Sequence, residues 1–310
     1  MASGDLARSL PITLTPFRPS RSLGTLTGGL VVVWCYGLAL LLVFRGLTLD
    51  TSINQLGPFL AAGFFFLVGS LYGYWTWGCQ TLTYIVDRNA LTIRWGAVRQ
   101  VIPLNKIERL IPGSEVEHPQ IEGVSWPGHH VGRASVEMIG EALFYSTHRT
   151  MREVLYVQTW EDTYAISVAE PIVFAQAIQA NLARGTLFDE PQTVRRWGVA
   201  AQSFWVDKLA LALTAVLIAT FAAVLGYVLS EYPDLSQSVA LRFPSLGGIL
   251  RVSDKSALLD IPRSAAGFLA VNLTLAVFLH SWERMVGYVL LLSGIAIQVM
   301  LLVAAVLAVP

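Results

Sequence analysis

The chain has 310 residues, of which 54% are hydrophobic and 14% are charged, and its mean hydropathy is +0.57. These values lie outside the usual range of soluble globular proteins and indicate a membrane protein. The formal net charge is zero, which gives no reason to propose nucleic acid as a partner.

Residues 1–27 form the N-terminal segment and precede the first apolar stretch. Arg8, Arg18 and Arg21 are scattered through this segment, and no apolar run begins before Leu30. A cleavable signal peptide needs such a run close to the start of the chain, so none is predicted. We expect residues 1–27 to form a short cytoplasmic segment.

Five apolar stretches are long enough to cross a bilayer as helices. We predict transmembrane helices at 28–44, 56–77, 209–229, 265–279 and 285–309. The first stretch is short, at about 17 residues, and it could cross fully or lie short and tilted. The pair at 28–77 forms a transmembrane hairpin, and residues 208–310 form a second transmembrane region.

Basic residues at the ends of these stretches predict which side of the membrane each loop occupies. They cluster before the first and third stretches, at Arg8, Arg18, Arg21, Arg184, Arg195, Arg196 and Lys208. The prediction is a bacterial inner-membrane protein with residues 1–27 and the insert at 78–207 in the cytoplasm. The C-terminus and the loop at 230–263 then lie outside, although four basic residues of that loop oppose the assignment: Arg242, Arg251, Lys255 and Arg263.

The middles of the apolar stretches contain no Asp, Glu, Lys, Arg or His. Ion and proton pathways normally need ionisable groups at membrane depth, so this pattern disfavours a transporter and an intramembrane protease. Asn272 and Gln298 are amides within the last two stretches, and we expect them to form interhelical hydrogen bonds rather than to contact a substrate. Cys35 and Cys79 are predicted to be buried thiols, not metal ligands or a disulfide.

The insert at 78–207 has short alternating strands and turn residues in place of long apolar runs. Strands are predicted at 81–87, 90–95, 98–102, 106–111, 136–144, 153–159 and 163–167, followed by one helix that begins at Pro171. The fold class is therefore an α+β membrane protein. It combines five transmembrane helices with an inserted antiparallel β-barrel or sandwich (core 81–184) that is capped by one C-terminal helix.

The insert also resembles a known family. The run from Tyr84 to Gly96, followed by Val101-Ile102-Pro103-Leu104, is similar to bacterial pleckstrin-homology-like (PH-like) domains. The strand at 164–167 and the helix start at Glu170-Pro171 are similar to the last strand and closing helix of that family. The resemblance covers about 105 residues. It implies a role in binding or scaffolding, for which the family is chiefly known, and some members oligomerise.

Basic residues on the predicted strands are the candidate lipid contacts. In the lipid-binding eukaryotic relatives a long basic hairpin loop holds the phosphates, whereas the loop Asp87-Arg88-Asn89 is short and contains an acid. Specific phosphoinositide-like binding is therefore not expected. The candidates for a looser contact with anionic lipid, at about 1 kcal/mol per basic residue near the surface, are Arg88, Arg94, Arg99 and Lys106. The alternative is that these side chains are simply solvated.

The loop at 112–132 holds the densest set of possible metal ligands: Glu115, Glu117, His118, Glu122, His129 and His130. Their spacing argues against a zinc site, because adjacent histidines on an extended chain point to opposite faces. We expect a solvated polar loop with Trp126 against the barrel, or with Trp126 as the anchor for a partner. His148 is predicted to lie at the surface. We predict no catalytic residue, cofactor or metal site, since the chain has no phosphate-binding loop or nucleophile elbow.

These features predict a non-enzymatic integral membrane interaction or scaffold protein. Its expected partners are the lipid bilayer and either other membrane subunits or a second copy, so an accessory subunit of a larger membrane complex fits. Arg94, Arg99 and Trp126 are the surface residues expected to matter most. Two alternatives stay open: a membrane sensor or regulator with the 230–263 loop as its detector, and a transporter or membrane enzyme with an unrecognised site.

Overall fold

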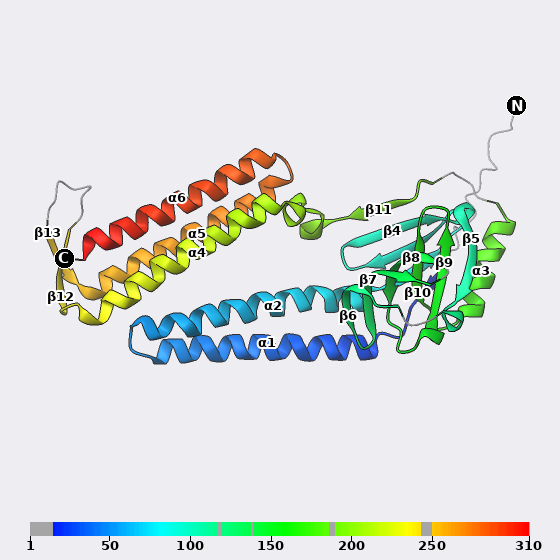
Figure 1. Cartoon of the computed structure of the whole chain (residues 1–310), viewed down its shortest axis with the longest axis horizontal. Helices are drawn as coiled ribbons and strands as arrows, with labels where there is room; N and C mark the ends of the chain where they lie inside the picture. The colour runs from blue at the N-terminus through cyan, green and yellow to red at the C-terminus, as the bar shows by residue number, and fades with distance from the viewer. Residues whose placement is uncertain (1–14, 117–118, 138, 186–189, 243–249, 310) are drawn as a thin grey trace, which may run out of the picture. The chain divides into compact units, whose positions relative to one another are not determined.

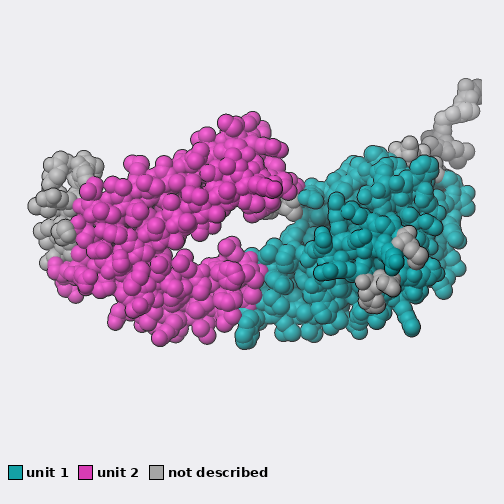
Figure 2. Space-filling view, viewed as in Figure 1, with its two compact units in different colours: residues 1–34, 69–197 teal, residues 35–68, 198–310 magenta. Residues whose placement is uncertain are grey.

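The computed structural model of the protein describes residues 15–116, 119–137, 139–185, 190–242 and 250–309. They fall into two compact units (Figure 2). Unit 1 contains residues up to 34 and residues 69–197, and unit 2 contains residues 35–68 and 198 onward. Unit 1 holds most of the β-rich insert together with helical residues 22–34 and 69–81.

Within the described residues, five helices are long and apolar enough to cross a membrane. They are α1 (Ser22–Thr48), α2 (Leu56–Thr81), α4 (Lys208–Glu231), α5 (Asp260–His280) and α6 (Arg284–Ala308), as Figure 1 shows. Each overlaps one predicted stretch, and α1 differs most in length. Its 27 residues span roughly 40 Å at 1.5 Å per residue, which exceeds the ~30 Å of a bilayer core. The first helix is therefore not a short element.

Polar residues at its beginning explain why α1 is longer than its apolar run. Thr27 stays helical by donating its hydroxyl to the carbonyl of Leu23, four residues earlier, at 2.9 Å. Such a bond satisfies the hydroxyl without solvent. A hydropathy pattern alone therefore underestimates the helix at its N-terminal end.

In unit 2, α4, α5 and α6 pack around small and aliphatic side chains, among them Leu217 and Leu291. Gln298 of α6 donates its side-chain N–H to the carbonyl of Ala265 on α5 at 2.8 Å. Ser293 of α6 donates its hydroxyl to Asn272 Oδ1 on α5 at 3.5 Å. Both amides that the sequence places in these helices thus contact a neighbouring helix, where a hydrogen bond replaces the missing water.

Asp207 caps the beginning of α4. Its Oδ1 accepts hydrogen bonds from the backbone N–H groups of Leu209 and Ala210, and its Oδ2 accepts one from the Tyr288 hydroxyl at 2.5 Å. The bond from Tyr288 is the largest cause that holds the pKa of Asp207 below its usual value. His280 Nε2 lies 3.2 Å from the same oxygen, although its ring is not aligned for a hydrogen bond. The carboxylate thus joins the beginnings of α4 and α6.

The insert and one strand of the N-terminal segment form two sheets in unit 1. One has five strands in the order β1 (Thr15–Phe17), β2 (Thr83–Val86), β3 (Ala90–Trp95), β4 (Val98–Pro103) and β11 (Thr193–Arg196). The other has six, in the order β5 (Ile107–Pro112), β9 (Val154–Thr159), β10 (Thr163–Ser167), β8 (Gly140–Ser146), β7 (His129–Val136) and β6 (Glu122–Trp126). The sheets do not close into a barrel, and β10 pairs with β8 in parallel. The antiparallel barrel alternative is therefore corrected to two sheets with one parallel pair.

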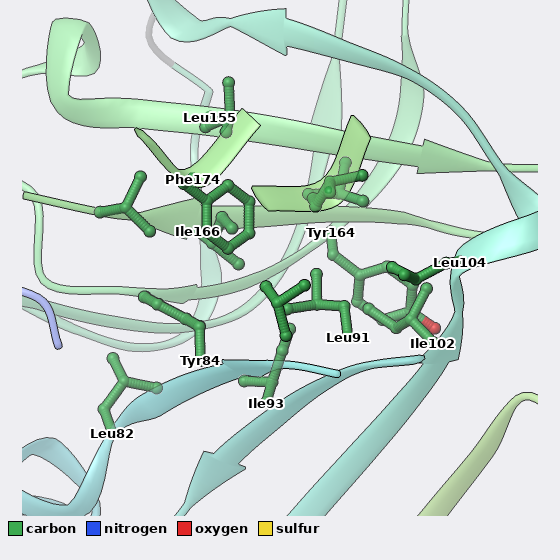
Figure 3. Close-up of a cluster of buried hydrophobic side chains, with 14 of the residues drawn as sticks. Leu82, Tyr84, Leu91, Ile93, Ile102, Leu104, Leu155, Tyr164, Ile166 and Phe174 are labelled. Carbon is green, nitrogen blue, oxygen red and sulfur yellow. The ribbon is translucent and has the colours of Figure 1, made fainter. Parts of the chain in front are cut away.

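A single core joins the two sheets to α3 (Pro171–Ala183). Figure 3 shows its side chains: Leu91 and Ile93 come from the first sheet, Tyr164 and Ile166 from the second, and Phe174 from α3. The period-two pattern of β3 places its apolar residues on this inner face. The alternate residues of β3, Thr92 and Arg94, lie on the outer face of the first sheet.

Tyr84 also links the sheets by hydrogen bonds. Its hydroxyl donates to the carbonyl of Tyr145 at 2.6 Å and accepts from the N–H of Ser167 at 3.1 Å. Full burial raises the pKa of Tyr84 far above its usual value, so it remains a neutral donor. Two backbone groups of the second sheet are thereby satisfied by one side chain of the first.

Several strands differ from the predictions. The predicted loop at 112–132 contains β6 and the beginning of β7, which form a hairpin around Gly128 at φ 80°. The strand predicted at 136–144 is instead the end of β7, a turn with Gly140 at φ 90°, and the beginning of β8. Strands β1 and β11 were not predicted, and the loop at 230–263 contains the paired strands β12 (Ser238–Arg242) and β13 (Leu250–Asp254).

Candidate functional site

Three arginines form a row across the outer face of the five-stranded sheet. Arg94 on β3 lies opposite Arg99 on β4, and Arg99 lies opposite Arg195 on β11. Residues directly opposite each other on neighbouring antiparallel strands place their side chains on the same face. Since Leu91 and Ile93 face the core, these three arginines face away from it. Adjacent strands are about 4.8 Å apart, so the row covers roughly 10 Å.

The row carries unbalanced positive charge. Like charges placed directly opposite each other across a sheet are destabilising. Within the described part of the chain, none of the ion pairs involves Arg94, Arg99 or Arg195. The pairing of β11 with β4 nevertheless continues past the row, since the N–H of Trp197 donates to the carbonyl of Ala97 at 3.0 Å. The strands thus hold the guanidinium groups together against their repulsion.

The row is one wall of a larger hollow, which we call the arginine cleft. The cleft has a volume of about 960 Å³. Its six arginines are Arg18, Arg21, Arg94, Arg99, Arg195 and Arg196. Other walls come from the last turns of α2, with Trp77, Gln80 and Thr81, and from Trp197. Among the described residues that line the cleft, none is an aspartate or a glutamate.

Two contacts hold the rim of the cleft in place. A guanidinium N–H of Arg21, just before α1, donates to the carbonyl of Gln80 near the end of α2. The rings of Trp77 and Trp197 meet edge to face at 5.9 Å between centroids. Both indoles keep part of their surface exposed. The rim therefore combines a fixed cationic side with an aromatic side.

The chain places the arginine cleft at the ends of two apolar helices. Arg18 and Arg21 directly precede α1, and Trp77 and Gln80 lie in the last turns of α2. If α1 and α2 cross a bilayer, these residues lie at its headgroup region, where tryptophan is enriched. A positively charged hollow at that level is suited to an anionic headgroup.

The sequence-predicted lipid contacts separate into two groups. Arg94 and Arg99 line the cleft. Arg88 instead donates to the carbonyls of Arg184 and Gly185 beyond α3, each at 2.9 Å, and Lys106 forms an ion pair with Glu161 at 2.8 Å. These two contacts give Arg88 and Lys106 structural partners away from the cleft.

Four cleft arginines were not proposed as contacts from the sequence: Arg18, Arg21, Arg195 and Arg196. Their only signal was the orientation pattern, in which basic residues precede an apolar stretch. Arg195 and Arg196 lie more than 170 residues from Arg18 and Arg21 in the chain. They reach the same cleft because β11 pairs with β4, and no local pattern encodes that pairing.

Trp126, the predicted partner anchor, packs inside unit 1. Its ring stacks on Tyr72 of α2 at 5.6 Å between centroids, and its Nε1–H donates to the carbonyl of Gly24 on α1 at 3.1 Å. A Cβ added at Gly24 would lie 2.2 Å from the carbonyl oxygen of Gly128. The hairpin of β6 and β7 is thereby attached to the beginning of α1 through backbone contact that only glycine permits.

The described histidines of the insert, His129, His130 and His148, are packing residues. His129 is fully buried, and this burial lowers its pKa to about 4, so the ring is neutral at pH 7. His148, expected at the surface, is buried instead and stacks on His130 at 4.1 Å between centroids. Glu117 and His118 of the possible metal set lie outside the described residues. Within the part of the chain that the structure describes, no group of three or more His, Cys, Asp or Glu side chains could hold a metal.

Comparison with protein families identifies part of the insert. Residues 82–182 match the family described as the bacterial PH domain. The match runs from just before β2 to the end of α3, so this region is a bacterial PH-like domain. Comparisons with curated proteins and with solved structures gave no match. Only Arg94 and Arg99 of the cleft arginines lie within 82–182, so the cleft is assembled largely from residues outside the family match.

Proposed function

We propose that the protein uses its bacterial PH-like domain as part of a non-enzymatic membrane interaction device, in which the arginine cleft binds the phosphate of an anionic lipid. One observation carries the proposal: six arginines without a lining carboxylate converge at the ends of two apolar helices. Guanidinium groups bind phosphate through paired, charge-assisted hydrogen bonds, which makes arginine the residue best suited to such a ligand.

The position of the cleft favours a lipid over a soluble anion. Anionic leaflets attract basic residues at their surface by about 1 kcal/mol each. Trp77 and Trp197 at the rim have the amphipathic character of residues that lie at headgroup level. In this proposal the N-terminal segment and the PH-like domain lie on the cytoplasmic side of a bacterial inner membrane, as the basic residues before α1 and α4 also favour.

The apolar helices give the cleft a role other than recruitment. A chain with five membrane-spanning helices stays in the bilayer whether or not the cleft is occupied. Occupancy instead determines where in the membrane, and next to which lipids, the domain is held. The proposed role is that of a scaffold or accessory subunit, whose partners are the bilayer and either other membrane subunits or a second copy.

The test measures lipid retention by the full-length chain. Purified protein is reconstituted in phosphatidylcholine nanodiscs with or without phosphatidylglycerol, released, and examined by native mass spectrometry. The comparison is between the wild type, the double variant Arg99→Gln/Arg195→Gln, and Arg152→Gln. Arg152 is an exposed arginine that does not line the cleft, so its variant controls for the loss of one positive charge away from the cleft.

The proposal predicts that the wild type and Arg152→Gln retain phosphatidylglycerol and that the double variant loses most of it. Equal retention by all three proteins would show that the cleft does not bind anionic lipid. A circular dichroism spectrum of each protein shows whether the variants keep their fold.

A further inference from the structure

We infer that the arginine cleft is built for a lipid whose headgroup carries two phosphates joined by a short polar linker. This inference rests on the proposed function and specifies its ligand. It follows from how the six arginines are distributed over the sheet. Five of them fall into two groups, and the six together carry far more positive charge than one phosphate balances.

The first group is the row of Arg94, Arg99 and Arg195, which ends at the β11 edge of the sheet. Three guanidinium groups on one face present more N–H donors than the oxygens of a single phosphodiester accept. One phosphate is therefore fully bound by this row alone. Its charge of about −1 leaves most of the positive charge of the cleft unbalanced.

The second group, Arg18 and Arg21, lies between β1 and α1 in the chain. Arg18 follows β1 by one residue, and β1 pairs with β2 at one edge of the sheet. Arg21 follows shortly after, and the contact of one of its N–H groups with Gln80 leaves the other donors of the guanidinium for a ligand. The strand that Arg18 follows, β1, is two strand spacings from Arg94 on β3, or about 10 Å. Two phosphates joined by a short linker suit two cationic groups at this spacing.

An uncharged strip separates the two groups. Thr83 on β2 pairs with Arg94 and so continues the row toward β1 without a charge. Its hydroxyl, bonded to the carbonyl of Thr81 at 3.1 Å, lies in the lining of the same cleft. A short linker with hydroxyl groups between the two phosphates would lie over this strip.

A second hollow favours a lipid over a soluble bisphosphate. It has a volume of about 500 Å³ and shares Arg21 and Gln80 with the arginine cleft. Ser22, Thr25 and Leu26 line it along the first turns of α1. Its direction, from the cleft along an apolar helix, is the one that the glycerol and acyl parts of a lipid would take.

The experiment compares lipids at equal phosphate. Phosphatidylcholine nanodiscs contain either phosphatidylglycerol, with one phosphate, or cardiolipin, with two phosphates joined by glycerol. The total phosphate of the anionic lipid is matched between the two. Native mass spectrometry measures the lipid retained by the wild type, Arg18→Gln/Arg21→Gln, Arg99→Gln/Arg195→Gln and the control Arg152→Gln. A separate sample adds inorganic pyrophosphate as the soluble competitor.

The inference predicts that the wild type and Arg152→Gln retain cardiolipin about tenfold better than phosphatidylglycerol. Arg18→Gln/Arg21→Gln should lose this preference while still retaining phosphatidylglycerol through the row of the other group. Arg99→Gln/Arg195→Gln should lose both lipids. Pyrophosphate at concentrations matched to the lipid should not displace cardiolipin, because it lacks the acyl chains.

Three results would overturn the inference, and each is distinguishable. Equal retention of the two lipids per phosphate, still abolished by Arg99→Gln/Arg195→Gln, leaves the proposed function intact but removes the two-phosphate ligand. Displacement of both lipids by pyrophosphate assigns the cleft to a soluble anion. Retention that no cleft variant changes removes the proposed function as well. Arg99→Lys keeps the positive charge but loses paired hydrogen bonding.

Discussion

Arg195 on β11 lies directly opposite Arg99 on β4, so a strand from outside the family match supplies one wall of the arginine cleft. This pairing places the Cβ atoms of the two arginines about 5 Å apart on one face of the sheet. The residues between α3 and α4 therefore complete a site that the PH-like domain contains only in part.

The first prediction concerns the stability of the empty cleft. Arg99→Gln removes the central charge of the row, so it should raise the free energy of unfolding in neutral lipid by up to about 1 kcal/mol. The same variant should lose the thermal stabilisation that anionic lipid confers on the wild type. Melting temperatures in phosphatidylcholine nanodiscs, with and without cardiolipin, measure both effects. A destabilised Arg99→Gln in neutral lipid would contradict the idea of unrelieved repulsion.

The second prediction concerns the attachment of the β6–β7 hairpin to α1. Gly24→Ala would place its Cβ 2.2 Å from the carbonyl oxygen of Gly128, which is backbone and cannot rotate away. We expect a loss of about 1–3 kcal/mol of stability, as for other overpacked sites. Gly29→Ala on the same helix meets nothing within 4 Å and is the matched control, expected to be neutral or stabilising. Limited proteolysis of the hairpin and thermal unfolding report both outcomes.

The third prediction separates two buried tyrosines. Tyr84→Phe removes the hydroxyl that donates to the carbonyl of Tyr145 and accepts from the N–H of Ser167, so two buried hydrogen bonds between the sheets are lost, at a cost of about 1–3 kcal/mol. The hydroxyl of Tyr156 is buried without a hydrogen-bond partner among the described residues, so Tyr156→Phe should be neutral or stabilising. Thermal unfolding of Tyr84→Phe and Tyr156→Phe, measured side by side, tests this prediction. Equal losses would show that the hydroxyl of Tyr84 does not link the sheets.

The fourth prediction is a pH dependence that comes from His129. Burial lowers its pKa to about 4 in the folded protein, whereas an unfolded histidine titrates near 6.5. Between these two pH values the histidine is protonated in the unfolded chain and neutral in the folded domain. The free energy of unfolding therefore falls as the pH drops from about 6.5 to 4. The shift corresponds to a loss on the order of 3 kcal/mol, complete below pH 4 and absent above about 6.5.

His129→Gln is the matched variant for this dependence. A glutamine side-chain oxygen can still accept from Trp95 Nε1, which approaches His129 Nε2 at 3.4 Å. Melting temperatures of the wild type and the variant are measured from pH 7.5 to pH 4.5. The wild type should lose more stability than the variant over this range, so the difference between their melting temperatures should become smaller toward pH 4.5. Parallel curves would assign the acid sensitivity to other groups, His130 among them, whose pKa burial also lowers.

The fold divides according to the range of the interactions that specify it. The alternation of Leu91, Ile93 and Trp95 predicts β3 and its buried face from neighbouring residues alone, and these three side chains are in the core. The β6–β7 hairpin escaped prediction because its polar and glycine residues are typical of loops, and its attachment comes from Trp126 against α1 and α2. Strands β1 and β11 are short and have no pattern of their own. They form because the edges of the sheet offer unpaired backbone groups.

The order of residues by itself determined that five helices are apolar enough for a membrane and that a PH-like domain lies between the second and third. Hydropathy and period-two alternation are local properties, so they can be recognised without coordinates. Only the tertiary structure decided that Arg18, Arg21, Arg195 and Arg196 join Arg94 and Arg99 around one cleft. Charges far apart in the chain become neighbours through strand pairing, whose partners are chosen by backbone hydrogen bonds and core packing and not by the charges themselves.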